Sequence, residues 1–268
     1  MKSITKMLKG TLAVILLLCV TACGKSQAKI DFEEAVTALE AKNQELDSAI
    51  SDLWVLLESE DRPLDPTLLE RSVEMMKNAE GAKVLPPEMG KGEEVIGKQA
   101  SELNAVDYST VITELKKLTE EMTTSIQQCK LVTNPPVEQV IKRILNVENI
   151  TNAEAVTEGN DPNGMLNKPG GYTSAIFFEC DLVPAKIHLS NTSAIEKGTS
   201  GGGCLEIYAT TEDAESRNAY ISSFDGRIFA AGKHAVIGTV VIRISGEMKE
   251  QDQELMIQRL IEALTAPE

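Results

Sequence analysis

The feature that most constrains the fold is an apolar seam that repeats every seven residues between residues 31 and 58. One heptad position holds Val36, Asn43, Ile50 and Leu57, and the other holds Leu39, Leu46 and Leu53. This alternation of three- and four-residue steps is typical of a helix that packs along its length against other helices. The sequence therefore predicts one long helix, which Asp31 can cap and Arg62-Pro63 ends.

Asn43 is the one polar residue in this seam. In a coiled coil, a buried asparagine can specify the register or the oligomeric state of the helices. The alternative is a bundle that leaves Asn43 at a solvated edge. We favour the solvated edge, because four heptads are short for an obligate coiled-coil dimer.

Two further helical stretches follow the seam. Asp65-Pro66 starts the first, since proline suits the first turn of a helix, and Gly81 with Pro86-Pro87 breaks it. The second extends from Glu93 to Val132, and Asp107-Tyr108-Ser109 could interrupt it with a new cap. Amphipathic helices joined by short breaks most simply close on themselves, so residues 31–133 are predicted to form an antiparallel bundle of about three helices.

Asn134-Pro135-Pro136 is the predicted domain boundary, because each proline disfavours helix in the residue before it. Beyond it, helices at Val137–Val147, after Thr211 and up to Leu264 are mixed with strands that do not alternate regularly with them. Residues 136–268 are therefore assigned to the α+β class, as a small and mostly antiparallel sheet with helices packed on one face. The predicted strands are Ala153–Thr157, Tyr172–Cys180, Cys204–Thr210 and Ala235–Ser245.

The amino-terminal residues carry an export signal. Lys2, Lys6 and Lys9 form a cationic region, and the 13 residues from Gly10 to Ala22 carry no charge. A transmembrane helix needs ~20 apolar residues, so this run is too short to span a bilayer and has the length of a signal-peptide core. It ends in Val20-Thr21-Ala22-Cys23, which resembles the lipobox of bacterial lipoproteins, although valine stands where leucine is commonest.

The resemblance to bacterial lipoproteins implies a location. It implies that residues 1–22 are removed, that Cys23 carries a diacylglyceryl group, and that residues 23–30 form a tether. The protein would then be held by lipid at the extracytoplasmic face of a membrane, which is the cell surface if the host has a single membrane. The alternative is an ordinary secretory signal with an incidental cysteine.

The charge of the chain limits its partners. Removal of residues 1–22 takes away three lysines and no acid, which lowers the net charge from −15 to −18. Nucleic acid is an unsuitable partner for so acidic a chain, because phosphate binding needs clustered lysine and arginine. Anionic lipid headgroups also repel it, so the membrane is expected to hold it only through the lipid on Cys23.

Gly198-Thr199-Ser200-Gly201-Gly202 fits the G-x-S-x-G motif of serine hydrolases. A nucleophile elbow needs a strand before the serine and a helix after it, whereas here a strand follows. The segment also looks like the surroundings of the nucleophile in trypsin-like proteases, but His188 is only twelve residues away, in a loop. We therefore interpret it as a flexible turn.

Residues 158–164 hold four oxygen-bearing side chains, which makes a calcium loop conceivable. Asp161-Pro162-Asn163-Gly164 is instead a strong type I turn signal. The two histidines, His188 and His234, have no closely spaced partner with which to begin a zinc site. No catalytic residue, metal site or cofactor is predicted.

Three cysteines remain after removal of the signal peptide and lipidation: Cys129, Cys180 and Cys204. Cys180 ends one predicted strand and Cys204 begins the next, so antiparallel neighbours would place them side by side. An extracytoplasmic compartment permits disulfides. The sequence therefore predicts a Cys180–Cys204 disulfide and a buried free thiol at Cys129.

The function expected from these observations is a non-enzymatic envelope module that binds an unidentified ligand or another envelope protein. Two alternatives stay open. One is an envelope hydrolase with an unrecognised site, which the low histidine count and the absence of motifs disfavour. The other is a structural spacer that assembles through its helical half.

Overall fold

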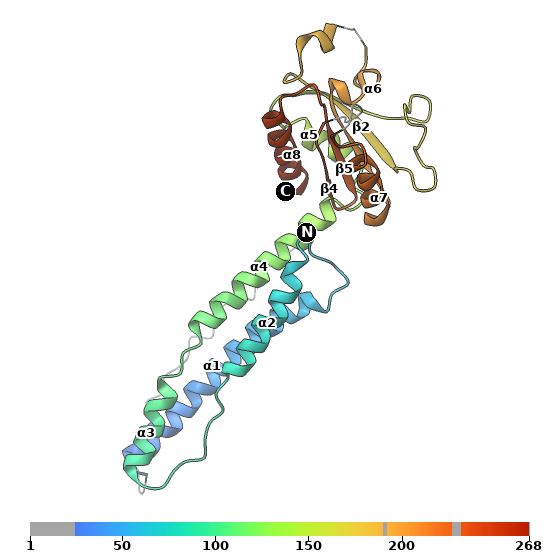
Figure 1. Ribbon diagram of the computed structural model, residues 1–268. Helices are drawn as coiled ribbons and strands as arrows, with labels where there is room; N and C mark the ends of the chain where they lie inside the picture. Colours follow the sequence, from blue (N-terminus) through green and yellow to red (C-terminus); the bar gives the residue numbers. More distant parts are fainter. Residues whose placement is uncertain (1–24, 190–191, 227–231, 268) are drawn as a thin grey trace, which may run out of the picture. The chain divides into compact units, whose positions relative to one another are not determined.

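The computed structural model describes residues 25–189, 192–226 and 232–267 (Figure 1). These residues form two compact units. The first unit contains residues 25–45 and Lys83–Tyr108, and the second contains Leu46–Ala82 and residues 109–267. Helix α1 (Gln27–Leu57) supplies residues to both units, so their boundary falls within the predicted heptad seam. Cys23 and the predicted signal peptide lie outside the described residues.

In the first unit, the beginning of α1 packs against α3 (Glu93–Asn104). Lys42 Nζ donates to the carbonyl oxygens of Asn104 (3.1 Å) and Val106 (2.5 Å), at the carboxyl end of α3, where a cation is favourable. The apolar core that the two helices share consists of Phe32, Ala35 and Leu39 from α1 with Ile96, Ala100 and Leu103 from α3.

Asn43 is buried in the first unit, with 7% of its surface exposed, so the predicted solvated edge is wrong. Its Oδ1 accepts a hydrogen bond from the Tyr108 hydroxyl (3.0 Å), and its Nδ2 donates to the carbonyl oxygen of Val84 (2.9 Å). These bonds satisfy the amide inside one chain, which removes the cost of burying it.

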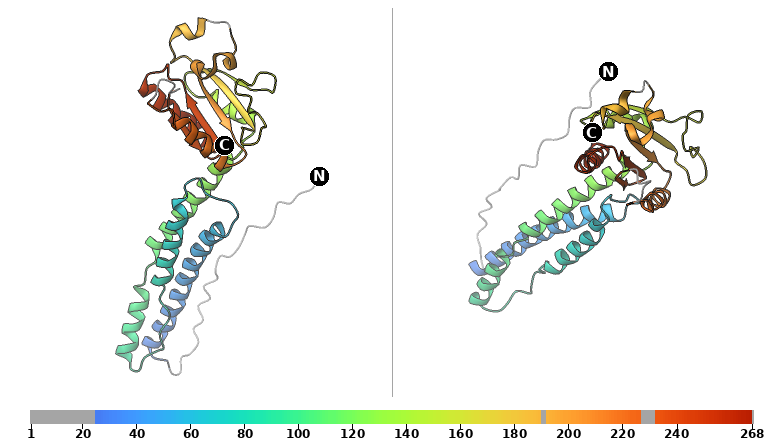
Figure 2. Two further views of the ribbon diagram at one scale, coloured as in Figure 1. Left: turned by 45° about the vertical axis from the view of Figure 1, so that its right-hand side comes forward. Right: turned by 45° about the horizontal axis from the view of Figure 1, so that its top comes forward.

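The residues from Lys83 to Gly92 form an extended segment, here called the pinned segment, that leads into α3 (Figure 2). At its beginning, Val84 N donates to the Tyr108 hydroxyl (2.8 Å). At its end, Gln99 on α3 donates from Nε2 to the Glu88 carbonyl (3.0 Å) and accepts from Gly90 N at Oε1 (2.9 Å). Side chains therefore hold this non-helical backbone at both ends.

The second unit contains α2 (Thr67–Ala82), α4 (Ser109–Leu131) and the rest of α1. The predicted interruption near Asp107-Tyr108-Ser109 is confirmed, because α3 and α4 are separate helices. Asp65 caps the start of α2 by accepting from Thr67 N at 3.0 Å, as the Asp65-Pro66 pair predicts. Among the described residues, no helix combines the length and apolar character needed to cross a bilayer.

The rest of the second unit is built on a five-stranded sheet with the order β1-β2-β3-β5-β4, in which every neighbouring pair is antiparallel. The predicted α+β class is confirmed. Three predicted strands correspond to observed ones with shifted ends. The strands are β1 (Ile150–Ala155), β2 (Ser174–Cys180), β3 (Gly202–Ile207), β4 (His234–Ile237) and β5 (Val240–Ile244).

Helices cover both faces of the sheet, so the prediction of helices on one face is corrected (Figure 1). The reason is that β2, β3 and β5 place apolar residues on both of their faces. On one face lie α5 (Val137–Ile144) and α8 (Glu250–Thr265). On the other face lie α6 (Ala194–Lys197) and α7 (Thr211–Ser222). The connection between β2 and β3 also contains two short helices, η1 (Ala185–Leu189) and η2 (Gly198–Gly201).

The predicted strand Ala235–Ser245 is two strands, because a tight turn at Gly238-Thr239 divides it into β4 and β5. Gly238 has a φ of 57°, which favours glycine, and a side chain there would meet the Val132 carbonyl oxygen at 2.5 Å. Thr239 N donates to that same oxygen (2.9 Å), and Thr239 Oγ1 accepts from Asn134 N (2.7 Å). The predicted boundary at Asn134-Pro135-Pro136 is thus tied to the sheet.

Candidate functional site

The face of the sheet that α6 and α7 cover carries charged and amide side chains among its apolar ones. Because side chains alternate along a strand, Glu179 shares this face with Phe177, and Glu206 shares it with Cys204. The strand register places Asn152 opposite Glu179 and Cys204 opposite Arg243. Two polar clusters result, one centred on Glu179 and one on Glu206.

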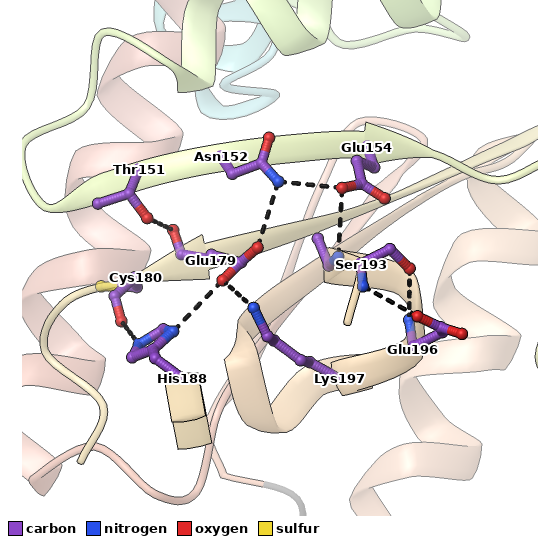
Figure 3. Close-up of polar contacts among 10 residues, drawn as sticks. Thr151, Asn152, Glu154, Glu179, Cys180, His188, Ser193, Glu196 and Lys197 are labelled. Carbon is purple, nitrogen blue, oxygen red and sulfur yellow. Dashed lines mark hydrogen bonds and ion pairs between the residues drawn. The ribbon is translucent and has the colours of Figure 1, made fainter. Parts of the chain in front are cut away.

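Glu179 lies at the centre of the first cluster, which Figure 3 shows. Lys197, from α6, donates to Glu179 Oε2 at 2.5 Å, and both side chains are nearly buried, with 8% and 12% of their surfaces exposed. Asn152 donates from Nδ2 to Glu179 Oε1 at 3.2 Å. His188 Nδ1, from η1, lies 3.3 Å from Glu179 Oε2. Three elements thus direct polar groups at one carboxylate.

A second carboxylate, Glu154 on β1, extends this cluster toward α6. Asn152 Nδ2 also lies 3.0 Å from Glu154 Oε1, so one amide bridges two acids. Ala194 N, in the first turn of α6, donates to the same oxygen at 3.3 Å. Ser193 and Glu196 close a capping box around that turn (Figure 3). The cluster therefore fixes both the place and the start of α6.

His188 faces acceptors with both of its ring nitrogens. Nε2 lies 3.1 Å from the carbonyl oxygen of Cys180, and Nδ1 faces Glu179. A neutral imidazole has one N–H and can donate to only one of them, whereas the imidazolium donates to both. Through these two contacts, His188 ties η1 to β2.

The electrostatics of the first cluster keep Glu179 ionised. Burial raises the pKa of this carboxyl, but hydrogen bonds from Lys197 and Asn152 and the lysine charge outweigh burial, so the pKa lies below its ordinary value. A carboxylate of this kind is a poor general acid, since it gives up its proton too readily. Its effect is to hold η1 and α6, in the β2–β3 connection, against the sheet.

Glu206 forms the second cluster with two arginines, and it is fully buried. Arg217 on α7 donates from Nε (2.7 Å) and Nη2 (2.9 Å), and Arg243 on β5 donates from Nη1 (2.9 Å). The Tyr208 hydroxyl adds a fourth bond at 2.9 Å. Burial raises the pKa of Glu206, but the hydrogen bonds and charges of the two arginines lower it by more than burial raises it. The pKa of this carboxyl therefore lies below its ordinary value. This triad attaches α7 to the middle of the sheet.

Cys180 and Cys204 do not pair, and the predicted disulfide is corrected. The strands are antiparallel neighbours as expected, but the register places Cys204 opposite Phe177, three residues from Cys180. An odd offset along a strand puts the two side chains on opposite faces. Cys180 accordingly lies in the core under α5 and α8, and Cys204 lies in the core under α6 and α7. Cys129 is half-buried rather than buried.

This geometry predicts the redox state of the protein. Cys180 and Cys204 should both be alkylated after denaturation without a reductant, because opposed side chains cannot meet the geometry of a disulfide. Peptide mapping by mass spectrometry would measure the alkylated fraction, with Cys129 as the internal reference. Recovery of a linked Cys180–Cys204 peptide from protein that was folded before oxidation would contradict the observed register.

The other sequence motifs have structural roles. Ser200 lies in η2, and its carbonyl oxygen accepts from the Ser245 hydroxyl at 3.1 Å. The turn interpretation of residues 161–164 is confirmed, since Gly164 N donates to the Asp161 carbonyl at 3.3 Å. The Asp161 carboxylate accepts from Leu166 N (2.8 Å) and from the Tyr172 hydroxyl. In the described ranges, no group of histidine, cysteine and acidic residues is arranged to hold a metal ion.

The sequence interpretation missed Glu179, Glu206 and Arg243, although a signal was present. Each is a single charge in an otherwise apolar strand, within AIFFEC, CLEIY and VVIRI. A charge on a strand that is covered on both faces needs an ionic partner. Comparison with known proteins adds no further candidate, because the chain matches no family model, no curated protein and no solved structure.

Proposed function

We propose that this chain is a lipid-anchored protein of the extracytoplasmic face of a bacterial membrane, where it binds another envelope protein without catalysis. Support for the location comes from the cationic region, the uncharged run and the lipobox that ends at Cys23. Support for protein binding comes from the pinned segment, Lys83–Gly92.

The pinned segment exposes apolar side chains on an ordered backbone. Leu85 has 73% of its surface exposed, and it precedes Pro86-Pro87, which are also exposed. Met89 and Val95 add exposed apolar surface beside it. Leaving such surface in water costs about 25 cal/mol per Å² relative to burial. Contiguous exposed apolar surface is characteristic of a contact site for another molecule.

The hydrogen bonds at both ends of the segment make this surface suitable for binding. A flexible loop loses conformational entropy when a partner orders it, and that loss weakens binding. Tyr108 and Gln99 already hold Val84, Glu88 and Gly90 in place. Folding of the protein therefore already orders most of this backbone, so binding loses little further conformational entropy. Contacts between a partner and Leu85 then add directly to the affinity.

Site-specific photo-crosslinking in the host cell tests this proposal. A photoreactive amino acid at position 85 should give one discrete crosslinked protein that co-fractionates with the envelope. The same amino acid at position 98 is the matched control, because Lys98 is a charged and exposed residue on α3 in the same unit, outside the pinned segment. Identical crosslinks from both positions, or none from position 85, would refute binding through the pinned segment.

A further inference from the structure

A second surface, separate from the pinned segment, lies between α2 and α4 within the second unit. Figure 1 shows these helices side by side. The space between them is hollowed into two adjoining cavities of about 290 and 520 Å³. Both cavities are lined by Arg71, Lys117 and Glu121, so they form one continuous groove, here called the α2–α4 groove.

The groove runs along both helices. Its lining begins at Asp65, just before α2, and ends at Asn78 on α2, and it begins at Glu114 and ends at Gln128 on α4. The helices are antiparallel, as the bond from Asp65 N to the Ser125 hydroxyl (2.9 Å) and the Arg71–Glu121 ion pair (3.1 Å) indicate. At 1.5 Å per residue, the groove is roughly 20 Å long, which equals about four turns of helix.

The lining of the groove combines apolar residues with an excess of acids. The apolar residues are Leu68, Met75 and Leu118, of which Leu68 and Leu118 are buried and Met75 is half-buried. The charged residues are the basic Arg71 and Lys117 together with more numerous acids, which are Asp65, Glu74, Glu114, Glu120 and Glu121. The excess is therefore three negative charges. Arg71 and Lys117 are both engaged by Glu121, at 3.1 and 3.6 Å.

Three acids of the lining remain available to basic groups of a partner. The side chains of Glu74, Glu114 and Glu120 make no hydrogen bond or ion pair with any other residue that the structure describes. The lining residues also recur at helical spacing, since Arg71, Glu74 and Asn78 follow one another by three and four positions along α2. Basic residues on successive turns of a bound helix would face Glu74 on α2 and Glu114 and Glu120 on α4.

We propose that the α2–α4 groove binds a cationic amphipathic helix of about four turns on a partner protein. Its apolar stripe would cover Met75 and the small exposed edges of Leu68 and Leu118, as a further helix does when it packs into the groove between two others. Its lysine and arginine side chains would pair with Glu74, Glu114 and Glu120. The charge excess of the groove selects this occupant over an acidic or neutral helix.

Two synthetic peptides provide the probes. One has sixteen residues of leucine and lysine in an amphipathic helical pattern, and the other has glutamate in place of every lysine. Isothermal titration at ~0.15 M salt, where charges more than ~8 Å apart are largely screened, measures Kd for the chain from Gly24 onward, which contains every described residue. The lysine peptide should bind and the glutamate peptide should not. Equal binding of the two peptides would overturn the proposal.

Matched charge reversals locate the binding. Glu74→Lys with Glu120→Lys alters the groove, whereas Glu70→Lys with Glu80→Lys makes the same change of net charge at exposed positions of α2 outside it. We expect the groove pair to weaken binding of the lysine peptide by about tenfold or more, and the control pair by less than about threefold. Equal losses would show that the peptide follows overall charge, and the groove would be excluded.

Protection from amide hydrogen exchange gives a second readout. The lysine peptide should slow exchange in α2 and α4, and it should leave α3 unchanged. Protection confined to other elements would overturn the proposal even if the peptide binds. These outcomes concern the second unit alone, so they are independent of the crosslinking at Leu85.

Discussion

Replacement of Glu206 with alanine is expected to lower the free energy of unfolding by about 3–5 kcal/mol. The loss would arise because Arg217 and Arg243 would remain charged and largely buried without the carboxylate that neutralises them. Urea denaturation followed by circular dichroism measures the change.

Two variants make this result specific. Glu215→Ala removes an exposed acid from the same helix as Arg217 and should change stability by less than about 0.5 kcal/mol. The triple variant Glu206→Leu, Arg217→Met and Arg243→Leu removes every charge of the triad together, so it should recover much of the loss. A Glu206→Ala protein as stable as Glu215→Ala would show that the triad does not stabilise the sheet.

Replacement of Cys23 with serine is expected to move the protein out of the membrane fraction, or to leave its precursor uncleaved. A serine hydroxyl cannot form the thioether that attaches the lipid, and two acyl chains account for stable anchoring. Fractionation of the host cells, with mass spectrometry of the amino-terminal peptide, measures both results. Cys129→Ser is the control, because it removes a thiol far from the signal. A mature, membrane-bound Cys23→Ser protein would refute the lipoprotein assignment.

Helices were the most predictable part of the fold, because their periodic apolar positions report directly on a buried stripe. Leu39, Leu46 and Leu53 lie on the seam, and all three are fully buried. The α+β class also followed from an order of helices and strands that does not alternate. The buried positions of α1 are thus those that the seven-residue repeat, a pattern local in the sequence, predicts.

Features that depend on distant residues were not predictable in the same way. The pairing of Cys180 and Cys204 depends on strand register, which the sequence near either cysteine does not specify, and a shift of one residue exchanges the faces. Asn43 is buried only because Tyr108, 65 positions away, supplies a hydroxyl to its amide. The turn at Gly238 was hidden in a run of β-branched residues, although a glycine there is a known turn signal.

The polar clusters lie between these extremes. The single charges at Glu179, Glu206 and Arg243 indicate that each residue has an ionic partner, but the sequence does not identify these partners. Lys197 reaches Glu179 from α6, 18 positions further along the chain, and Arg217 reaches Glu206 from α7. Only the fold of the β2–β3 connection and of α7 brings these residues together.

The strand order also determines when the sheet can be completed during synthesis. Central strand β3 pairs with β2 and with β5, and β5 and α8 are the last two described elements. A chain that emerges from its amino end can therefore assemble α1, α2 and α4 while β2 and β3 still expose the surface that α8 covers with Met256 and Leu260. Exposed strands of this kind aggregate readily before they are covered. The nascent sheet thus most needs protection from aggregation in the interval before α8 has been synthesised and has packed on it.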